Sequence, residues 1–168
     1  MNQQRSHETI MPPRRLADKV SRGDGPELSD IVARAEAALE VMKDDYTASV
    51  HEDLAAFYAA LDAIKASRGE IRAEALKRVY QVSHDMRTQG KTFGYPLITQ
   101  IGSSLCDFIE THGEAAATRP EVIDAHGGAM RAVIAAKVTG DGGAIGQKLV
   151  SDINALVAKA VKKLAAAD

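Results

Sequence analysis

The stretch Ser-His-Asp-Met-Arg-Thr-Gln-Gly-Lys-Thr-Phe-Gly, residues 83–94, carries the strongest functional pattern in the 168-residue chain. Its histidine is His84, and an imidazole, which is largely neutral near pH 7, can act as a nucleophile. In a helix, Arg87, Thr88 and Lys91 share the face of this histidine, because residues three, four and seven places apart lie on one side of a helix. A nucleophile beside two cations suits an anionic reaction partner.

A second stripe on the same helix predicts how it packs. Apolar or small residues recur at alternating steps of three and four, which is the spacing of a buried seam: Leu76, Val79, Ser83, Met86, Gly90 and Phe93. His84 lies roughly a third of a turn to one side of this seam, because each residue advances a helix by about 100°. We therefore expect His84 at the edge of a helical bundle, with its ring half exposed.

The stretch resembles the phosphoacceptor segment of histidine-containing phosphotransfer (HPt) domains. The resemblance consists of a large apolar residue two places after the histidine, a cation three places after it, and an apolar residue followed by Gly nine and ten places after it. It covers about a dozen residues strictly, and the helical framework extends it loosely over residues 46–139. The resemblance implies these roles: His84 as phosphoacceptor, Met86 in the core, Arg87 as the usual cation, Gly90 as a small packing residue, and Phe93 with Gly94 at the end of the helix.

One residue departs from the family pattern. The position four places after the histidine is usually Gly, which lets a receiver domain approach closely, and here it is Thr88. This departure puts tight docking and the choice of partner in question. It also keeps an alternative open, in which the chain is a non-catalytic helical adaptor, a degenerate HPt domain that binds a receiver domain or kinase without accepting phosphate.

The resemblance implies that the chain relays a phosphoryl group between receiver-domain aspartates of a hybrid sensor kinase and a response regulator. Arg87 and Lys91 would stabilise the phosphoryl group, and Thr88 and Gln89 would offer it hydrogen bonds. The chain would need no cofactor of its own, because Mg²⁺ is expected on the partner receiver domain. No ATP-binding motif is visible, which implies a phosphocarrier and not an autonomous kinase. The family orients its histidine from the following helix, where the sequence leaves four candidates: Gln100, Ser103, Ser104 and Asp107.

The composition favours an all-α fold, since Ala is abundant, only 4% of residues are aromatic and Trp is absent. We expect an antiparallel four-helix bundle of the HPt kind with additional flanking helices. A net charge of −2 argues against nucleic acid as a partner. We find neither a membrane-spanning stretch nor a signal peptide, and therefore expect a cytoplasmic protein with no membrane partner. The single cysteine, Cys106, is predicted to be a buried structural thiol.

The chain is predicted to divide into a flexible basic tail, residues 1–26, and a single helical domain, residues 27–168. Helices are expected at 27–43, 49–67, 70–91, 96–111 and 120–139, and from the turn at 140–143 to 166. The first two are expected to be antiparallel, separated by a break at Asp44 and Asp45. Small residues on the fourth helix, Thr99, Gly102, Ser103 and Cys106, are expected to allow close packing against the helix of His84.

The remaining signals are interpreted structurally. His126 lies within an apolar helical face and is predicted to be a packed or hydrogen-bonded core residue. His51 lacks a partner three or four residues on that would complete a helical metal pair, and His112 is expected at a helix end, where a cation is favourable for structural reasons alone. Residues 140–148 lack the spacing of a phosphate-binding loop and are predicted to be a turn between helices. The oligomeric state stays open between monomer and dimer, with the first or last helix as the candidate interface.

Overall fold

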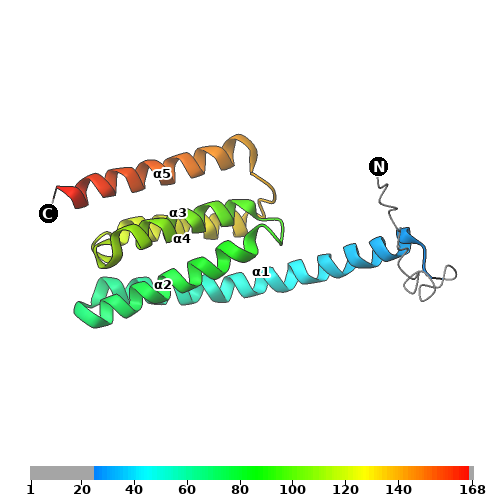
Figure 1. The fold of residues 1–168 in the computed structure, drawn as a ribbon, viewed down its shortest axis with the longest axis horizontal. Helices are drawn as coiled ribbons and strands as arrows, with labels where there is room; N and C mark the ends of the chain where they lie inside the picture. Colours follow the sequence, from blue (N-terminus) through cyan, green and yellow to red (C-terminus); the bar gives the residue numbers. More distant parts are fainter. Residues whose placement is uncertain (1–24, 167–168) are drawn as a thin grey trace, which may run out of the picture. The chain divides into compact units, whose positions relative to one another are not determined.

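The computed structural model describes residues 25–166, apart from the side chains of residues 40 and 43–45 (Figure 1). The predicted basic tail therefore lies almost wholly outside the described residues. The chain divides into two units, residues 1–36 and 37–168, and the described part of the first consists mainly of the start of helix α1.

Every regular element between residues 25 and 166 is a helix, so the predicted all-α class is confirmed. The elements are α1 (Leu28–Ala66), α2 (Gly69–Gly90), α3 (Pro96–His112), the 3₁₀ helix η1 (Gly113–Thr118), α4 (Pro120–Ala135) and α5 (Gly143–Ala165). None of the described helices is both long enough and apolar enough to cross a membrane.

The predicted break near residues 44–45 is wrong, because α1 runs without interruption through both predicted helices. No Gly or Pro occurs between residues 27 and 68. An aspartate inside a helix costs at most about 0.7 kcal/mol relative to Ala, which is too little to end a long helix. Burial of Tyr46 and Val50 directly after the two aspartates adds apolar contacts that favour the continuous helix.

The other helix ends agree better with the sequence. α2, α3 and α5 begin or end within a residue of the predicted bounds, and Pro96 and Pro120 occupy the first turns of α3 and α4. Gly94 and Gly113 adopt positive φ angles of 85° and 53° after the helices they follow, a conformation that Gly adopts readily. α4 ends four residues before the predicted end, and Lys137 beyond it has a φ of 48°. The 3₁₀ helix was not predicted.

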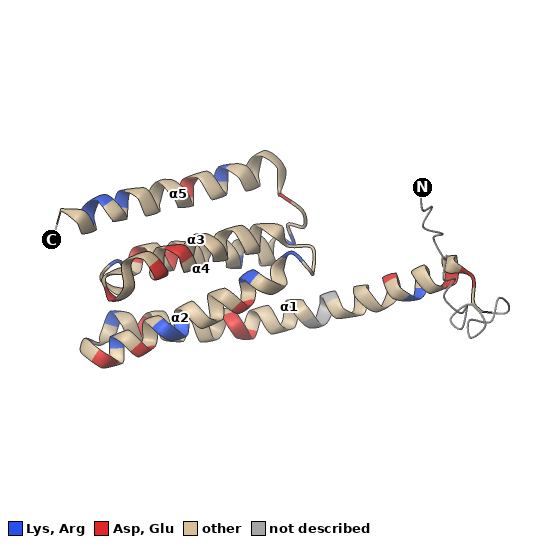
Figure 2. Cartoon of the chain, in the orientation of Figure 1, with Lys and Arg blue, Asp and Glu red and all other residues tan. Residues whose placement is uncertain are grey.

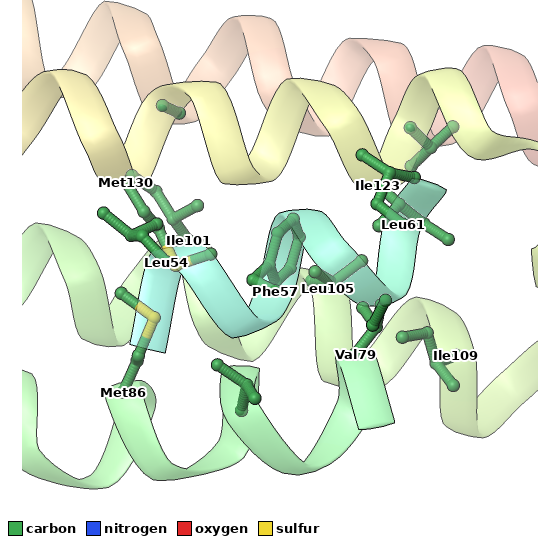
Figure 3. Packing of buried hydrophobic residues seen from close by; sticks show 14 of the residues in the cluster. Leu54, Phe57, Leu61, Val79, Met86, Ile101, Leu105, Ile109, Ile123 and Met130 are labelled. Carbon is green, nitrogen blue, oxygen red and sulfur yellow. The ribbon is translucent and has the colours of Figure 1, made fainter. Parts of the chain in front are cut away.

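In the unit of residues 37–168, α3 is the central helix, because it packs against α2, α4 and α5 (Figure 1). One apolar cluster joins the helices, and α1 contributes to it from Tyr46 onwards. Figure 3 shows its centre, where side chains of α1, α2, α3 and α4 meet: Leu54, Phe57, Leu61, Val79, Met86, Ile101, Leu105, Ile109, Ile123 and Met130. Phe57 is so close to α4 that a Cβ atom added at Gly127 would overlap its ring.

Apolar residues earlier in α1 are exposed. In the first unit, Leu28 is 76% exposed, and Ile31 and Val32 are also exposed. In the second unit, Leu39 and Met42 are exposed as well. These apolar side chains are therefore not buried in the part of the chain that the structure describes. The lysines near the end of α5, Lys159, Lys162 and Lys163, are exposed, and the last two lie in its last turn (Figure 2).

Candidate functional site

His84 lies on α2 at the edge of the apolar core. Its side chain is 41% exposed, which confirms the expected half-exposed ring. The predicted seam beside it is buried at Leu76, Val79, Ser83, Met86 and Gly90, and Phe93 is partly buried. Phe93 stacks on Tyr46 of α1, with ring centroids 4.5 Å apart. The seam thus fixes α2 against the core and leaves the face of His84 at the surface.

Two glycines bring α2 and α3 close together, as the small residues of α3 predicted. A Cβ atom added at Gly102 would lie 3.0 Å from the Cβ of Arg87 and 3.1 Å from the carbonyl oxygen of Ser83. A Cβ atom added at Gly90 would lie 2.9 Å from the carbonyl oxygen of Tyr95. All three distances are tighter than ordinary van der Waals contact, so a larger residue at either position would push the backbones apart.

Thr99 of α3 links to the backbone at the end of α2. Its hydroxyl donates to the carbonyl oxygen of Arg87 at 3.0 Å and accepts a hydrogen bond from the backbone N–H of Lys91 at 2.9 Å. The backbone of α2 is therefore bonded to α3 at Arg87 and Lys91, the two predicted phosphate-binding cations, which lie one and two turns after His84.

The imidazole of His84 has two close neighbours on its own helix. The Nδ1 atom lies 3.8 Å from Oδ1 of Asp85, which is beyond hydrogen-bonding distance. The ring of Tyr80 lies one turn earlier, with its centroid 6.0 Å from that of the imidazole and the planes inclined by 33°. These three residues, with Arg78 and Gln81, line a shallow pocket of about 370 Å³.

The other predicted site residues differ in exposure. Thr88 and Lys91 are exposed, and Arg87 and Gln89 are partly buried. The Thr88 hydroxyl donates to the carbonyl oxygen of Asp85 at 2.8 Å, so its proton is engaged within the helix. Gly90 is buried in the crossing with α3, and the carbonyl oxygen of Gly94 accepts a hydrogen bond from the N–H of Gly140.

The charge of Arg87 also affects the buried thiol of Cys106. Burial raises the pKa of the Cys106 thiol to about 11, although the nearby Arg87 guanidinium acts in the opposite direction. Cys106 is fully buried, which confirms the prediction of a structural thiol. Its thiol is therefore protonated near neutral pH and contributes packing.

The four α3 residues expected to orient His84 lie in a groove between α3 and α5. Gln100, Ser103, Ser104 and Asp107 all line a groove of about 550 Å³ together with residues of α5. Ser104 lies within hydrogen-bonding distance of Asn154 on α5 and of His126 on α4. The expectation that one of these four positions the ring of His84 therefore has no support in the structure.

Sequence reasoning missed the contact that does join this part of α2 to α3. The hydroxyl of Tyr80 donates to Oε1 of Glu110 at 2.5 Å. The available signal was the position of Tyr80, four residues before His84 and hence on the same helical face. Its partner, 30 residues later, was not detectable without the α2–α3 register.

His126 is a core histidine, as predicted. Its side chain is fully buried on α4, with Nδ1 2.7 Å from the carbonyl oxygen of Val122 and Nε2 3.2 Å from the Ser104 hydroxyl. A carbonyl oxygen only accepts, so Nδ1 carries the proton and the unprotonated Nε2 faces the Ser104 hydroxyl. Burial lowers the pKa of His126 below its usual 6.5, and the hydrogen bond to Val122 opposes this shift.

Across residues 25–166, no cluster of three or more His, Cys, Asp or Glu side chains has the arrangement needed to hold a metal ion. Comparisons with protein-family models, curated proteins and solved structures find no match to this chain.

Proposed function

We propose that this chain is a histidine phosphotransfer protein that relays a phosphoryl group between receiver-domain aspartates through His84. The observation that carries the proposal is a half-exposed histidine on a helix whose backbone is held at close range by the next helix. The same proposal interprets the fold as an antiparallel four-helix bundle with flanking helices. The meeting of α1, α2, α3 and α4 side chains in one core supports that interpretation.

The proposed reaction uses the ring nitrogen remote from Asp85. Asp85 lies on the Nδ1 side of the imidazole and favours a proton there, which leaves the lone pair on Nε2. Nε2 attacks the phosphorus of an aspartyl phosphate in line, so an N–P bond forms as the bond between phosphorus and the carboxylate oxygen breaks. The products are phosphohistidine and a free aspartate on the receiver domain.

Arg87 and Lys91 supply positive charge for this transfer. They lie three and seven residues after His84 on the same helical face, and Thr99 anchors the backbone of both. Partial burial limits the freedom of the Arg87 side chain, while exposed Lys91 remains able to steer an acidic receiver surface. Mg²⁺ would be held by the receiver domain.

The alternative function is a helical adaptor that binds a receiver domain or kinase without accepting phosphate. It is favoured by Thr88, which is exposed on the face of His84 at the position where a glycine would allow the closest approach. The hydroxyl of Thr88 bonds within its own helix and is therefore not free to compensate by donating to a phosphoryl oxygen.

The two functions are separated by offering the purified protein a panel of phosphorylated receiver domains, and measuring both binding and transfer. The phosphotransfer proposal predicts an acid-labile, base-stable label on the wild type that His84→Gln abolishes. His51→Gln is the matched control, because His51 is an exposed helical histidine bonded to the carbonyl oxygen of Thr47. A receiver that binds but never transfers its label would support the adaptor.

A further inference from the structure

Tyr80 is the side chain against which the imidazole of His84 lies. Side chains on a helix lean toward its N-terminus, so the ring of His84 covers the turn that contains Tyr80. The two ring centroids are 6.0 Å apart, and the rings are inclined by 33°. Both residues line the same shallow pocket, so the tyrosine forms one wall of the space in which the imidazole can turn.

The position of Tyr80 is itself fixed from the neighbouring helix. Its phenol hydroxyl donates to Glu110 Oε1 at 2.5 Å, a short hydrogen bond to a charged acceptor, which is the stronger kind. This bond is also the main reason that the pKa of Tyr80 is raised. A tyrosine held at both its Cα and its hydroxyl has little freedom to rotate.

The Tyr80–Glu110 hydrogen bond joins α2 to α3. The contacts of Gly102 and Thr99 with α2 join the same two helices again, toward the C-terminal end of α2. The ring of His84 lies in the interval between these links, with Asp85 on its Nδ1 side. The hydroxyl of Tyr80 donates its hydrogen bond to Glu110, so Tyr80 acts on a phosphoryl group only through the orientation of His84.

We infer that Tyr80, held by Glu110, is a positioning residue that keeps the imidazole of His84 with Nε2 directed outward for phosphoryl transfer. This inference rests on the proposed function. It assigns to Tyr80 and Glu110 together the orienting role that the sequence placed on Gln100, Ser103, Ser104 or Asp107.

The inference is tested first without any partner protein, by long-range ¹H–¹⁵N NMR of the His84 ring in the full chain. Tyr80→Leu removes the wall, and Tyr80→Phe keeps the ring but removes its link to Glu110. We expect both variants to move the two ring nitrogens toward the tautomer mixture of an unconstrained imidazole, with the larger change in Tyr80→Leu. Glu110→Gln retains an oxygen that can accept the hydrogen bond from Tyr80, so its His84 spectrum should stay close to that of the wild type. Tyr58→Phe is the control, since Tyr58 lies on α1 against Phe57 and Arg131.

The second readout is transfer from a receiver domain that phosphorylates the wild type. Misorientation of the attacking atom should lower kcat by about 10-fold in Tyr80→Phe and leave KM unchanged, since receiver docking is intact. If the wild type accepts no phosphoryl group, the proposed function fails, while the NMR spectra still decide whether Tyr80 orients the ring. Unchanged His84 spectra in both Tyr80 variants would overturn the inference. If the wild type transfers, an unchanged kcat in Tyr80→Phe would overturn it as well.

Discussion

His84 lies on α2 at the edge of the helical core and His126 lies on α4 inside it, and the two differ in almost everything that decides the use of a histidine. His84 is 41% exposed, and no backbone carbonyl within residues 25–166 makes a hydrogen bond to its ring. His126 is fully buried, and both ring nitrogens have partners, a carbonyl oxygen on one side and a serine hydroxyl on the other. A satisfied, buried imidazole has no lone pair to offer an incoming substrate. An exposed one with an open Nε2 does.

The largest expected effect is on phosphotransfer. His84→Gln should remove the label completely, whereas His126→Gln should still be labelled once it is shown by circular dichroism to be folded. Gel-based transfer from a phosphorylated receiver domain measures both variants side by side. Loss of label in the folded His126 variant, with retention in the His84 variant, would reverse the roles of the two histidines.

The second effect concerns the close packing of α2, the helix of His84, against α3. Gly102→Ala places a methyl group 3.0 Å from the Cβ of Arg87, so we expect unfolding by urea to show a loss of about 1 to 3 kcal/mol from overpacking. Gly128→Ala is the matched control, since nothing lies within 4 Å of the added atom on α4. That variant should gain roughly 0.5 to 1 kcal/mol from helix propensity. Equal effects at the two glycines would mean that the α2–α3 crossing is not tight.

The third effect is a pH dependence of stability that belongs to His126. Its folded-state pKa is lowered from 6.5 by burial, so below that pH the unfolded chain binds more protons than the folded one. The free energy of unfolding should therefore fall as the pH drops from 6.5 toward the lower folded-state value. Urea titrations between pH 7 and 5 should show this slope in the wild type and in His51→Gln, and a shallower slope in His126→Gln. A slope unaffected by the His126 substitution would assign it to other groups.

The smallest effect separates docking from transfer at Thr88. Thr88→Gly should tighten binding of a receiver domain by a few-fold, at a cost in helix stability of a few tenths of a kcal/mol. Thr88→Ala is the control for the lost hydroxyl and methyl groups without the added backbone freedom. Isothermal titration calorimetry measures the affinities. Binding that weakens in both variants would show that Thr88 makes a favourable contact of its own.

Local patterns predicted much of this arrangement. The apolar seam through Val79 and Met86 predicted which face of α2 is buried and that His84 lies at the edge of the core. The small residues of α3 predicted its close packing against α2. Such features depend only on spacing along one helix. The apolar face around His126 likewise gave its burial.

Features that depend on which helix faces which were not predicted. The sequence contains a break signal at Asp44 and Asp45, but core contacts from Tyr46 onwards outweigh so weak a signal. Gln100 and Ser103 were good candidates to orient His84 by residue type alone. Their place in a groove against α5, and the pairing of Tyr80 with Glu110, follow from the register of α3 between its neighbours. Register is a tertiary property, and one helix does not encode it.

The central claim is that Nε2 of His84 accepts a phosphoryl group from a receiver-domain aspartate. The most direct test is ³¹P and ¹⁵N NMR of the protein with ¹⁵N-labelled histidine rings, after incubation with a phosphorylated receiver domain and Mg²⁺. We predict one phosphohistidine signal, with ³¹P coupling to Nε2 of His84, that is absent in His84→Gln. A phosphohistidine signal that persists in His84→Gln, or no signal from any receiver that binds, would contradict the claim.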